Sequence, residues 1–222
     1  MMTPANSSTE LMLLLALRLK GLGEVDAVAD VHALDVDETE WALAELIESG
    51  KCVYRPVDGV MKYLLTPSGR ELGEQALWQE IDDPSKKQKI QQAYNEFRSL
   101  EQGMFQLLAD WQVVDGTNVH QRVNKHDDHL YDQEILERLY NLDVNLQKIL
   151  EPLARMFSRY QNYGNRFTKA LDLLRNGEME YLMKPLIGSY STLWFEFHED
   201  LLATLGINRA SEGSTWQLPS AT

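Results

Sequence analysis

Two segments of this 222-residue chain are dense in side chains that can ligate a metal or bind a small molecule. They span residues 120–132 and 190–200, and together they hold four of the five histidines. A metal site needs three or four converging His, Cys, Asp or Glu ligands. Four side chains would supply them if the first segment packs on a helix formed by the second. These candidate ligands are His126, His129, Asp132 and His198.

The spacing of these residues does not favour a metal. The chain contains neither a helical His-x-x-x-His pair nor a paired Glu-x-x-His motif. The alternative is a polar loop before a helix that is capped by Asp128 or by the Tyr131-Asp132 pair. We therefore predict no metal site.

Aromatic side chains offer a second chemistry in the same segments. Trp194 and His198 lie four residues apart and would share one face of a helix. With Trp111 and Tyr190 they would line an aromatic pocket for a small ligand, and ordinary aromatic packing is the alternative. The full set of candidate pocket residues is Trp111, His126, His129, Tyr190, Trp194 and His198.

The sequence offers no catalytic residue. It has no Gly-x-Ser-x-Gly elbow, no P-loop and no dinucleotide-binding glycine fingerprint. The single cysteine, Cys52, falls in an expected β-strand, where it acts as a small buried hydrophobe. We therefore expect neither an enzyme nor a cofactor. One cysteine also excludes an intrachain disulfide and fits a reducing cytoplasm.

Membrane attachment is not expected. The apolar run at 11–17 has no basic residue before it and no small-residue cleavage site after it, unlike a signal peptide. No apolar stretch approaches the roughly 20 residues that span a bilayer.

The first 80 residues have the element order of a winged helix-turn-helix. The patterns predict helices at 9–20, 24–32 and 37–49, the last capped by Asp37 and stopped by Gly50. Strands at 52–55 and 61–65 follow, joined by the Asp58-Gly59 pair that favours a tight turn. A further helix follows Thr66-Pro67. We predict a winged-helix domain at 9–80.

In a DNA-binding domain of this kind, the third helix lies in the major groove of the DNA. Its expected outer face carries only acids and a tryptophan: Asp37, Glu38, Trp41, Glu45 and Glu48. Base readout normally relies on Arg, Lys, Asn or Gln. The residues that we expect to contact DNA or a partner are Glu38, Trp41, Glu45, Lys51, Arg55, Lys62 and Arg70.

Charge argues against DNA in this domain. The whole chain has 21 basic and 34 acidic residues, a formal charge of −13. Residues 1–80 hold six of the bases and fourteen of the acids, a charge of −8. A close carboxylate–phosphate pair costs about 1 kcal/mol even in water, and three wing cations would give only weak, salt-sensitive binding. A solvated acidic face and a protein-docking face centred on Trp41 are the alternatives.

The second half of the chain is predicted to be helical throughout. Helices are expected at about 86–112, 132–158, 164–176 and 178–205. Their leucines recur at intervals of three and four residues, as on the apolar face of a helix. These helices suit a bundle at 85–207 that dimerises or senses a ligand. The polar tail at 208–222 is expected to be disordered.

A family resemblance agrees with this organisation. Residues 9–209 resemble MarR-like winged-helix regulators of actinobacterial type, and the same module resembles the C-terminal part of some pyruvate phosphate dikinase-like proteins. The resemblance implies a winged helix joined to a helical domain and carries over no catalytic residue. It rests on residues 15–21, 46–53, 63–70, 111–112, 131–132, 185–190 and 194–202.

Two functions are compatible with these features. The first is a cytosolic transcriptional regulator that contacts DNA through helix 37–49 and wing 51–65 and forms a homodimer. The second is a subunit that does not bind DNA and whose acidic winged helix docks a protein, such as a phosphoenolpyruvate- or phosphate-handling enzyme.

Overall fold

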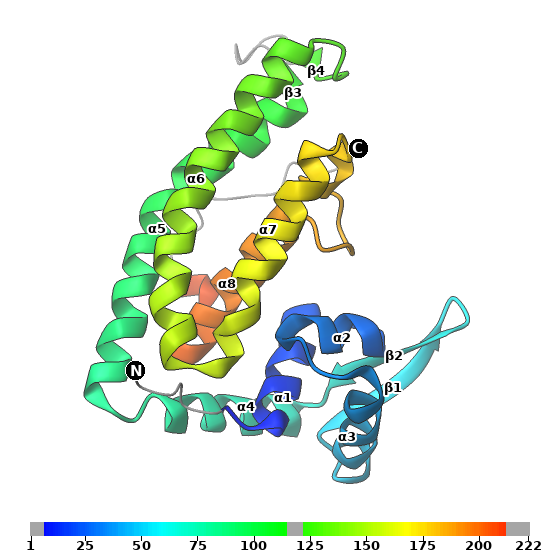
Figure 1. The fold of residues 1–222 in the computed structure, drawn as a ribbon. Coiled ribbons are helices and arrows are strands. Elements are labelled where there is room, and N and C mark those ends of the chain that lie inside the picture. Colours follow the sequence, from blue (N-terminus) through cyan, green and yellow to red (C-terminus); the bar gives the residue numbers. More distant parts are fainter. Residues whose placement is uncertain (1–6, 115–121, 212–222) are drawn as a thin grey trace.

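The computed structural model describes residues 7–114 and 122–211. Within these residues the fold is mainly helical, as predicted, with a small antiparallel β-hairpin near the N-terminal end. Figure 1 shows a long helical pair at one side of the molecule and a smaller group of helices with the hairpin at the other. The predicted disorder of the tail falls mostly on residues 212–222, which lie outside the described residues.

Three short helices open the chain, followed by the hairpin and a fourth helix. Ser8 caps the first helix, Gly50 adopts a left-handed conformation after the third, and Thr66 caps the fourth. The bounds are α1 Thr9–Lys20, α2 Val25–His32, α3 Val36–Glu48, β1 Cys52–Val57, β2 Val60–Leu65 and α4 Pro67–Glu80.

The hairpin closes one side of the small helical group. Asp58 and Gly59 both have positive φ, the backbone of a tight turn, which confirms the prediction made from the Asp-Gly pair. Cys52 pairs with Leu65, and both contact the cluster built around α1, α2 and α3. The hairpin therefore covers the core of the first three helices on its inner face.

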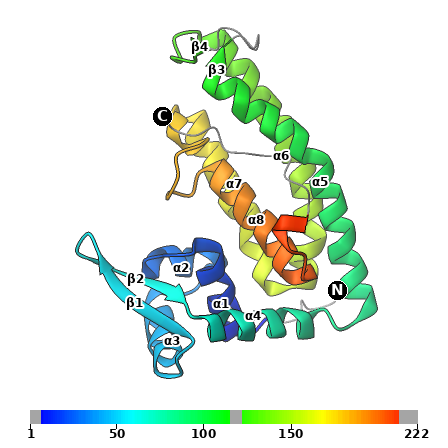
Figure 2. The same ribbon diagram turned by 180° about the vertical axis from the view of Figure 1, so that it is seen from behind.

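The second half of the chain is built on two long antiparallel helices. These are α5 (Pro84–Gln112) and α6 (His129–Met156), joined at their far end by the short strands β3 (Val113–Val114) and β4 (Arg122–Val123). α7 (Gln161–Arg175) and α8 (Tyr190–Leu205) pack beside them (Figures 1 and 2). Short 3-10 turns lie at Ser158–Tyr160, Met179–Tyr181 and Arg209–Ser211.

Three predicted helix boundaries were wrong. Asp35, not Asp37, caps α3, because its carboxylate accepts the backbone N–H of Glu38. α7 runs through Gly164, since the chain turns earlier at 157–160. The predicted helix 178–205 begins only at Tyr190, because the segment with Pro185 and a left-handed Leu186 cannot continue a helix.

The last helix joins the two halves of the chain. α8 packs against α5 and α7 and also against α1 and α4, while α2 contacts α7. Leu11 and Leu15 from α1, Leu77 from α4 and Ala203 from α8 form an apolar cluster at this junction. None of the described helices is both long enough and apolar enough to cross a bilayer.

Candidate functional site

The outer face of α3 is acidic around one exposed tryptophan. Trp41 is 80% exposed, and Glu38 and Glu45 are exposed on the same helix. The opposite face packs inward through Thr39, Leu43 and Leu46. The acids predicted to point outward therefore do so, and no arginine or lysine lies on this helix.

The basic residues near α3 are few. Lys62 lies on β2 opposite Arg55 on β1, and its ammonium group is 3.7 Å from the carboxylate of Glu24. Among the described residues, Lys51 and Arg55 have no ion-pair partner. Lys51 and Arg55, which have no ion-pair partner within the described residues, therefore lie near a helix whose charged residues are all acidic.

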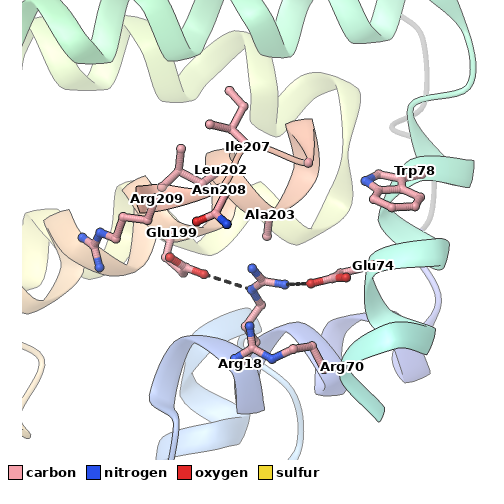
Figure 3. Close-up of a pocket in the computed structure, with 11 residues that line it drawn as sticks. Arg18, Arg70, Glu74, Trp78, Glu199, Leu202, Ala203, Ile207, Asn208 and Arg209 are labelled. Carbon is pink, nitrogen blue, oxygen red and sulfur yellow. Dashed lines mark hydrogen bonds and ion pairs between the residues drawn. The ribbon is translucent and has the colours of Figure 1, made fainter. Parts of the chain in front are cut away.

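Arg70 lies apart from these residues. It belongs to the first turns of α4 and lines a cavity between α4 and the end of α8 (Figure 3). The structure therefore does not place Arg70 with Trp41 on one contact surface.

The predicted pocket residues fall into separate places. Trp111 and His126 meet at the far end of the long helical pair, with ring centroids 4.3 Å apart. There the His126 Nδ1 is 3.1 Å from both carboxylate oxygens of buried Asp132, and Asn124 donates to the same carboxylate at 3.0 Å. His129 is exposed at the start of α6.

Three of the predicted pocket residues belong to α8 and are buried in the helical core. They are Tyr190, Trp194 and His198. Trp194 packs on Phe97 with ring centroids 4.4 Å apart, and His198 packs on the same ring at 5.4 Å. The hydroxyl of Tyr190 donates to Asp143 at 2.9 Å. Phe97 and Trp111 are about four turns, or about 21 Å, apart along α5, so the six residues do not form one pocket.

The proposed metal ligands are separated in the same way. Residues 7–114 and 122–211 contain no group of three or more His, Cys, Asp or Glu side chains placed to hold an ion. His126 contacts Asp132, whereas His198 lies near Glu101 in the core. His120 lies outside the described residues.

A fully buried arginine links α4 and α8, and sequence reasoning missed it. Arg159 forms ion pairs with Glu80 at 2.7 Å and with Asp200, and donates to Thr204 at 2.9 Å. Burial alone would lower the pKa of Arg159, but the carboxylates of Asp200 and Glu80 raise it well above its ordinary value. Arg159 therefore stays charged in the interior.

Two tyrosines complete this cluster. Tyr160 and Tyr163 donate their hydroxyls to Asp200 at 2.9 and 3.1 Å. Burial raises the pKa of both phenols well above 10, and the negative charge of Asp200 adds to this effect. Protonated phenols and a guanidinium thus satisfy one buried carboxylate.

A second ionic cluster ties α1 and α2 to the bundle. Glu196 of α8 pairs with Lys20 and with Arg166, each at 2.7 Å. Arg166 also reaches Asp30 of α2 at 3.1 Å. These contacts fix the N-terminal helices against α7 and α8.

The cavity that contains Arg70 has a volume of about 320 Å³. Figure 3 shows Arg18 at its centre, held between Glu74 of α4 at 2.7 Å and Glu199 of α8 at 3.0 Å. Trp78 stands at one side of this cavity. A larger groove of about 610 Å³ shares Arg18, Glu199 and Arg209 with it. In volume, both fall within the range of small-molecule sites.

The sequence carried only one signal for this cavity. Arg70 and Trp78 lie eight residues apart on α4, which places them on the same side of the helix about two turns, or about 12 Å, apart. Arg18 and Glu199 are 181 residues apart, and no local pattern relates them.

Comparison of the chain with protein-family models, with curated proteins and with solved structures found no match. The resemblance to MarR-like regulators therefore stays a prediction.

Proposed function

We propose that this protein is a winged-helix interaction subunit whose third helix docks a basic surface of a protein partner. In this proposal α1–α3, the hairpin and α4 are the winged helix, and the remaining helices are the bundle that carries it. The division follows the element order predicted for 9–80 and 85–207.

The acidic face of α3 with its exposed indole carries the proposal. An aromatic anchor surrounded by charge is a common interface pattern. Trp41 is 80% exposed, so leaving it in water costs apolar hydration that a partner pocket would relieve. Glu38 and Glu45 beside it favour arginine and lysine on the partner and repel nucleic-acid phosphates.

DNA binding is the second candidate, because the element order is that of a DNA-binding motif and because Lys51 and Arg55 form no ion pair within residues 7–114 and 122–211. In this alternative the hairpin, not α3, contacts the phosphates. Two such contacts give weak binding that falls steeply with salt.

A crosslinking experiment tests the docking proposal. A photoreactive amino acid replaces Ala44, which is exposed on α3 three residues from Trp41. The captured protein is purified, and its affinity for the full chain is measured. Trp41→Ala is expected to weaken this complex at least about tenfold while leaving the urea midpoint unchanged. Leu130→Ala on α6 is the matched control, because Leu130 is 79% exposed and far from α3.

The same protein sample separates the two candidates. We expect no gel shift of pooled genomic fragments at micromolar protein in about 50 mM salt. Retardation that Arg55→Gln abolishes would replace the docking proposal with the DNA-binding one. Equal affinity of Trp41→Ala and the wild type for the captured protein would also reject docking through α3.

The homodimer expected from the sequence belongs to this proposal as well. The long α5–α6 pair exposes Val144, and light scattering on the full chain measures whether two copies associate.

A further inference from the structure

The cavity between α4 and the end of α8 combines an unpaired cation with an apolar wall. Its lining comes from three elements and the turn that follows α8, so it exists only when the two halves of the chain are packed together (Figure 3). The residues that line it are Arg18, Arg70, Glu74, Trp78, Glu199, Leu202, Ala203, Gly206, Ile207, Asn208 and Arg209.

The charges in this cavity are not balanced. Glu74 and Glu199 both pair with Arg18, which fixes these three side chains together. Among the described residues, Arg70 and Arg209 have no ion-pair partner. The three arginines and two glutamates of the lining leave a net charge of +1 in this cavity, within a chain of net charge −13.

The guanidinium of Arg70 lies beside Arg18 in Figure 3, whereas Arg209 lies on the other side of Glu199. A guanidinium donates two parallel hydrogen bonds to phosphate oxygens. Arg70 is therefore placed to hold an anionic group next to a cation that is itself held in position.

The opposite wall suits a flat ring. Trp78 is 51% exposed, and its indole lies against Gly206, where a Cβ would come within 3.2 Å of the indole nitrogen. Gly206 has a positive φ of 67°, so the turn after α8 brings backbone, not a side chain, to the tryptophan. Leu202 and Ile207 add apolar surface. An exposed indole face is a stacking surface for a planar ring.

We propose that this cavity binds a phosphomonoester that carries a planar ring, with a nucleoside monophosphate as the simplest probe. Arg70 binds the phosphate, which carries a charge of about −2, and Trp78 stacks on the ring. No residue of α3 lines this cavity. A nucleotide could therefore bind here whether or not α3 docks a partner.

Isothermal titration of the full chain with the four common ribonucleoside monophosphates tests the site. At least one is expected to bind, with the corresponding nucleoside and inorganic phosphate each at least about tenfold weaker. Arg70→Gln is expected to weaken binding by about tenfold or more, and Trp78→Leu to weaken it and to remove the fluorescence change on binding. Arg122→Gln is the matched control, because Arg122 is an exposed arginine on β4 that does not line this cavity.

Three outcomes would overturn the proposal. The first is the absence of binding by all four nucleotides at millimolar concentration. The second is equal affinity for a nucleoside and its monophosphate, which removes the role of the anion. The third is equal weakening by Arg70→Gln and Arg122→Gln, which would show that only the overall charge of the protein matters. The urea midpoints of the variants check that each is folded.

Discussion

At the scale of single residues, an uncharged histidine is buried between the two halves of the chain. This residue is His32, at the end of α2. Its Nδ1 donates to the backbone carbonyl of Arg159 at 3.0 Å, which makes Nδ1 the protonated nitrogen of the neutral ring. Burial lowers the pKa of His32 to about 4, although the charge of Asp200 acts in the opposite direction.

His32 therefore makes stability depend on pH. The pKa of about 4 in the folded chain lies below the ordinary 6.5, so the unfolded chain takes up the proton first as pH falls. The contribution of neutral His32 is full above 6.5, declines between 6.5 and 4 and is lost below 4. Urea unfolding at about pH 7 and pH 4.5 should show a loss in the wild type that exceeds the loss in His32→Gln by about 2 kcal/mol.

The matched control for this prediction is His129→Gln, since His129 is exposed on α6. As the pH falls from about 7 to 4.5, that variant should lose as much stability as the wild type does. If His32→Gln also keeps the full pH dependence, the buried histidine is not the group that titrates.

At the scale of elements, the start of α4 shows how a local motif and a tertiary contact combine. Thr66 caps the helix by accepting the N–H of Gly69 at 3.1 Å, and it donates to the carbonyl of Gly50 at 2.8 Å. The first turn of α4 is thus fixed against the end of α3. Gly69 is buried there because the backbone at Lys51 lies directly against it.

This contact predicts opposite effects for two glycine substitutions in helices. A Cβ at Gly69 would lie 2.0 Å from the carbonyl oxygen of Lys51, so Gly69→Ala should destabilise the protein by about 2 kcal/mol or more. A Cβ at Gly103 in α5 would meet only a Leu142 methyl at 3.8 Å, so Gly103→Ala should stabilise it by about 0.5–1 kcal/mol. Urea midpoints measure both, and stabilisation by Gly69→Ala would contradict the close packing of α4 on Lys51.

At the scale of the whole molecule, Arg159 is the most deeply buried of the charges that join the two halves. It lies just after α6 and reaches Glu80 at the end of α4 and Asp200 within α8. All three side chains are almost completely removed from water. Removing Arg159 leaves the buried carboxylates of Glu80 and Asp200 without a counterion. This lowers the free energy of unfolding far more than the loss of an ion pair at the surface does.

Arg159→Met should therefore destabilise the protein by about 3–5 kcal/mol and separate the unfolding of the two halves. In the wild type, far-UV circular dichroism and tryptophan fluorescence should report one coincident transition. In the variant, circular dichroism and fluorescence should report unfolding transitions at different urea concentrations.

Arg155→Met provides the control, because Arg155 pairs with Glu151 on the exposed face of α6. An exposed pair contributes about 0–1 kcal/mol, so this variant should unfold as the wild type does. Equal effects of the two substitutions would show that Arg159 does not join the halves.

The sequence by itself determined the features that depend on neighbours along the chain. The Asp58-Gly59 turn, the stop at Gly50 and the long leucine-rich helices follow from backbone preferences and from apolar periodicity. The same local signals misplaced the start of α3, since Asp35 and Asp37 are equally good caps and only the packing of Thr39 and Leu43 selects the register.

Only the tertiary structure decided which distant residues share a site. It placed Trp194 and His198 in the core, His126 at the tip of the helical pair, and Arg70 in a cavity with Arg18. Helix period tells which face is apolar, but it does not tell which helix covers that face. That choice depends on how α8 packs across both halves, through apolar burial and ion pairs that join residues far apart in the chain.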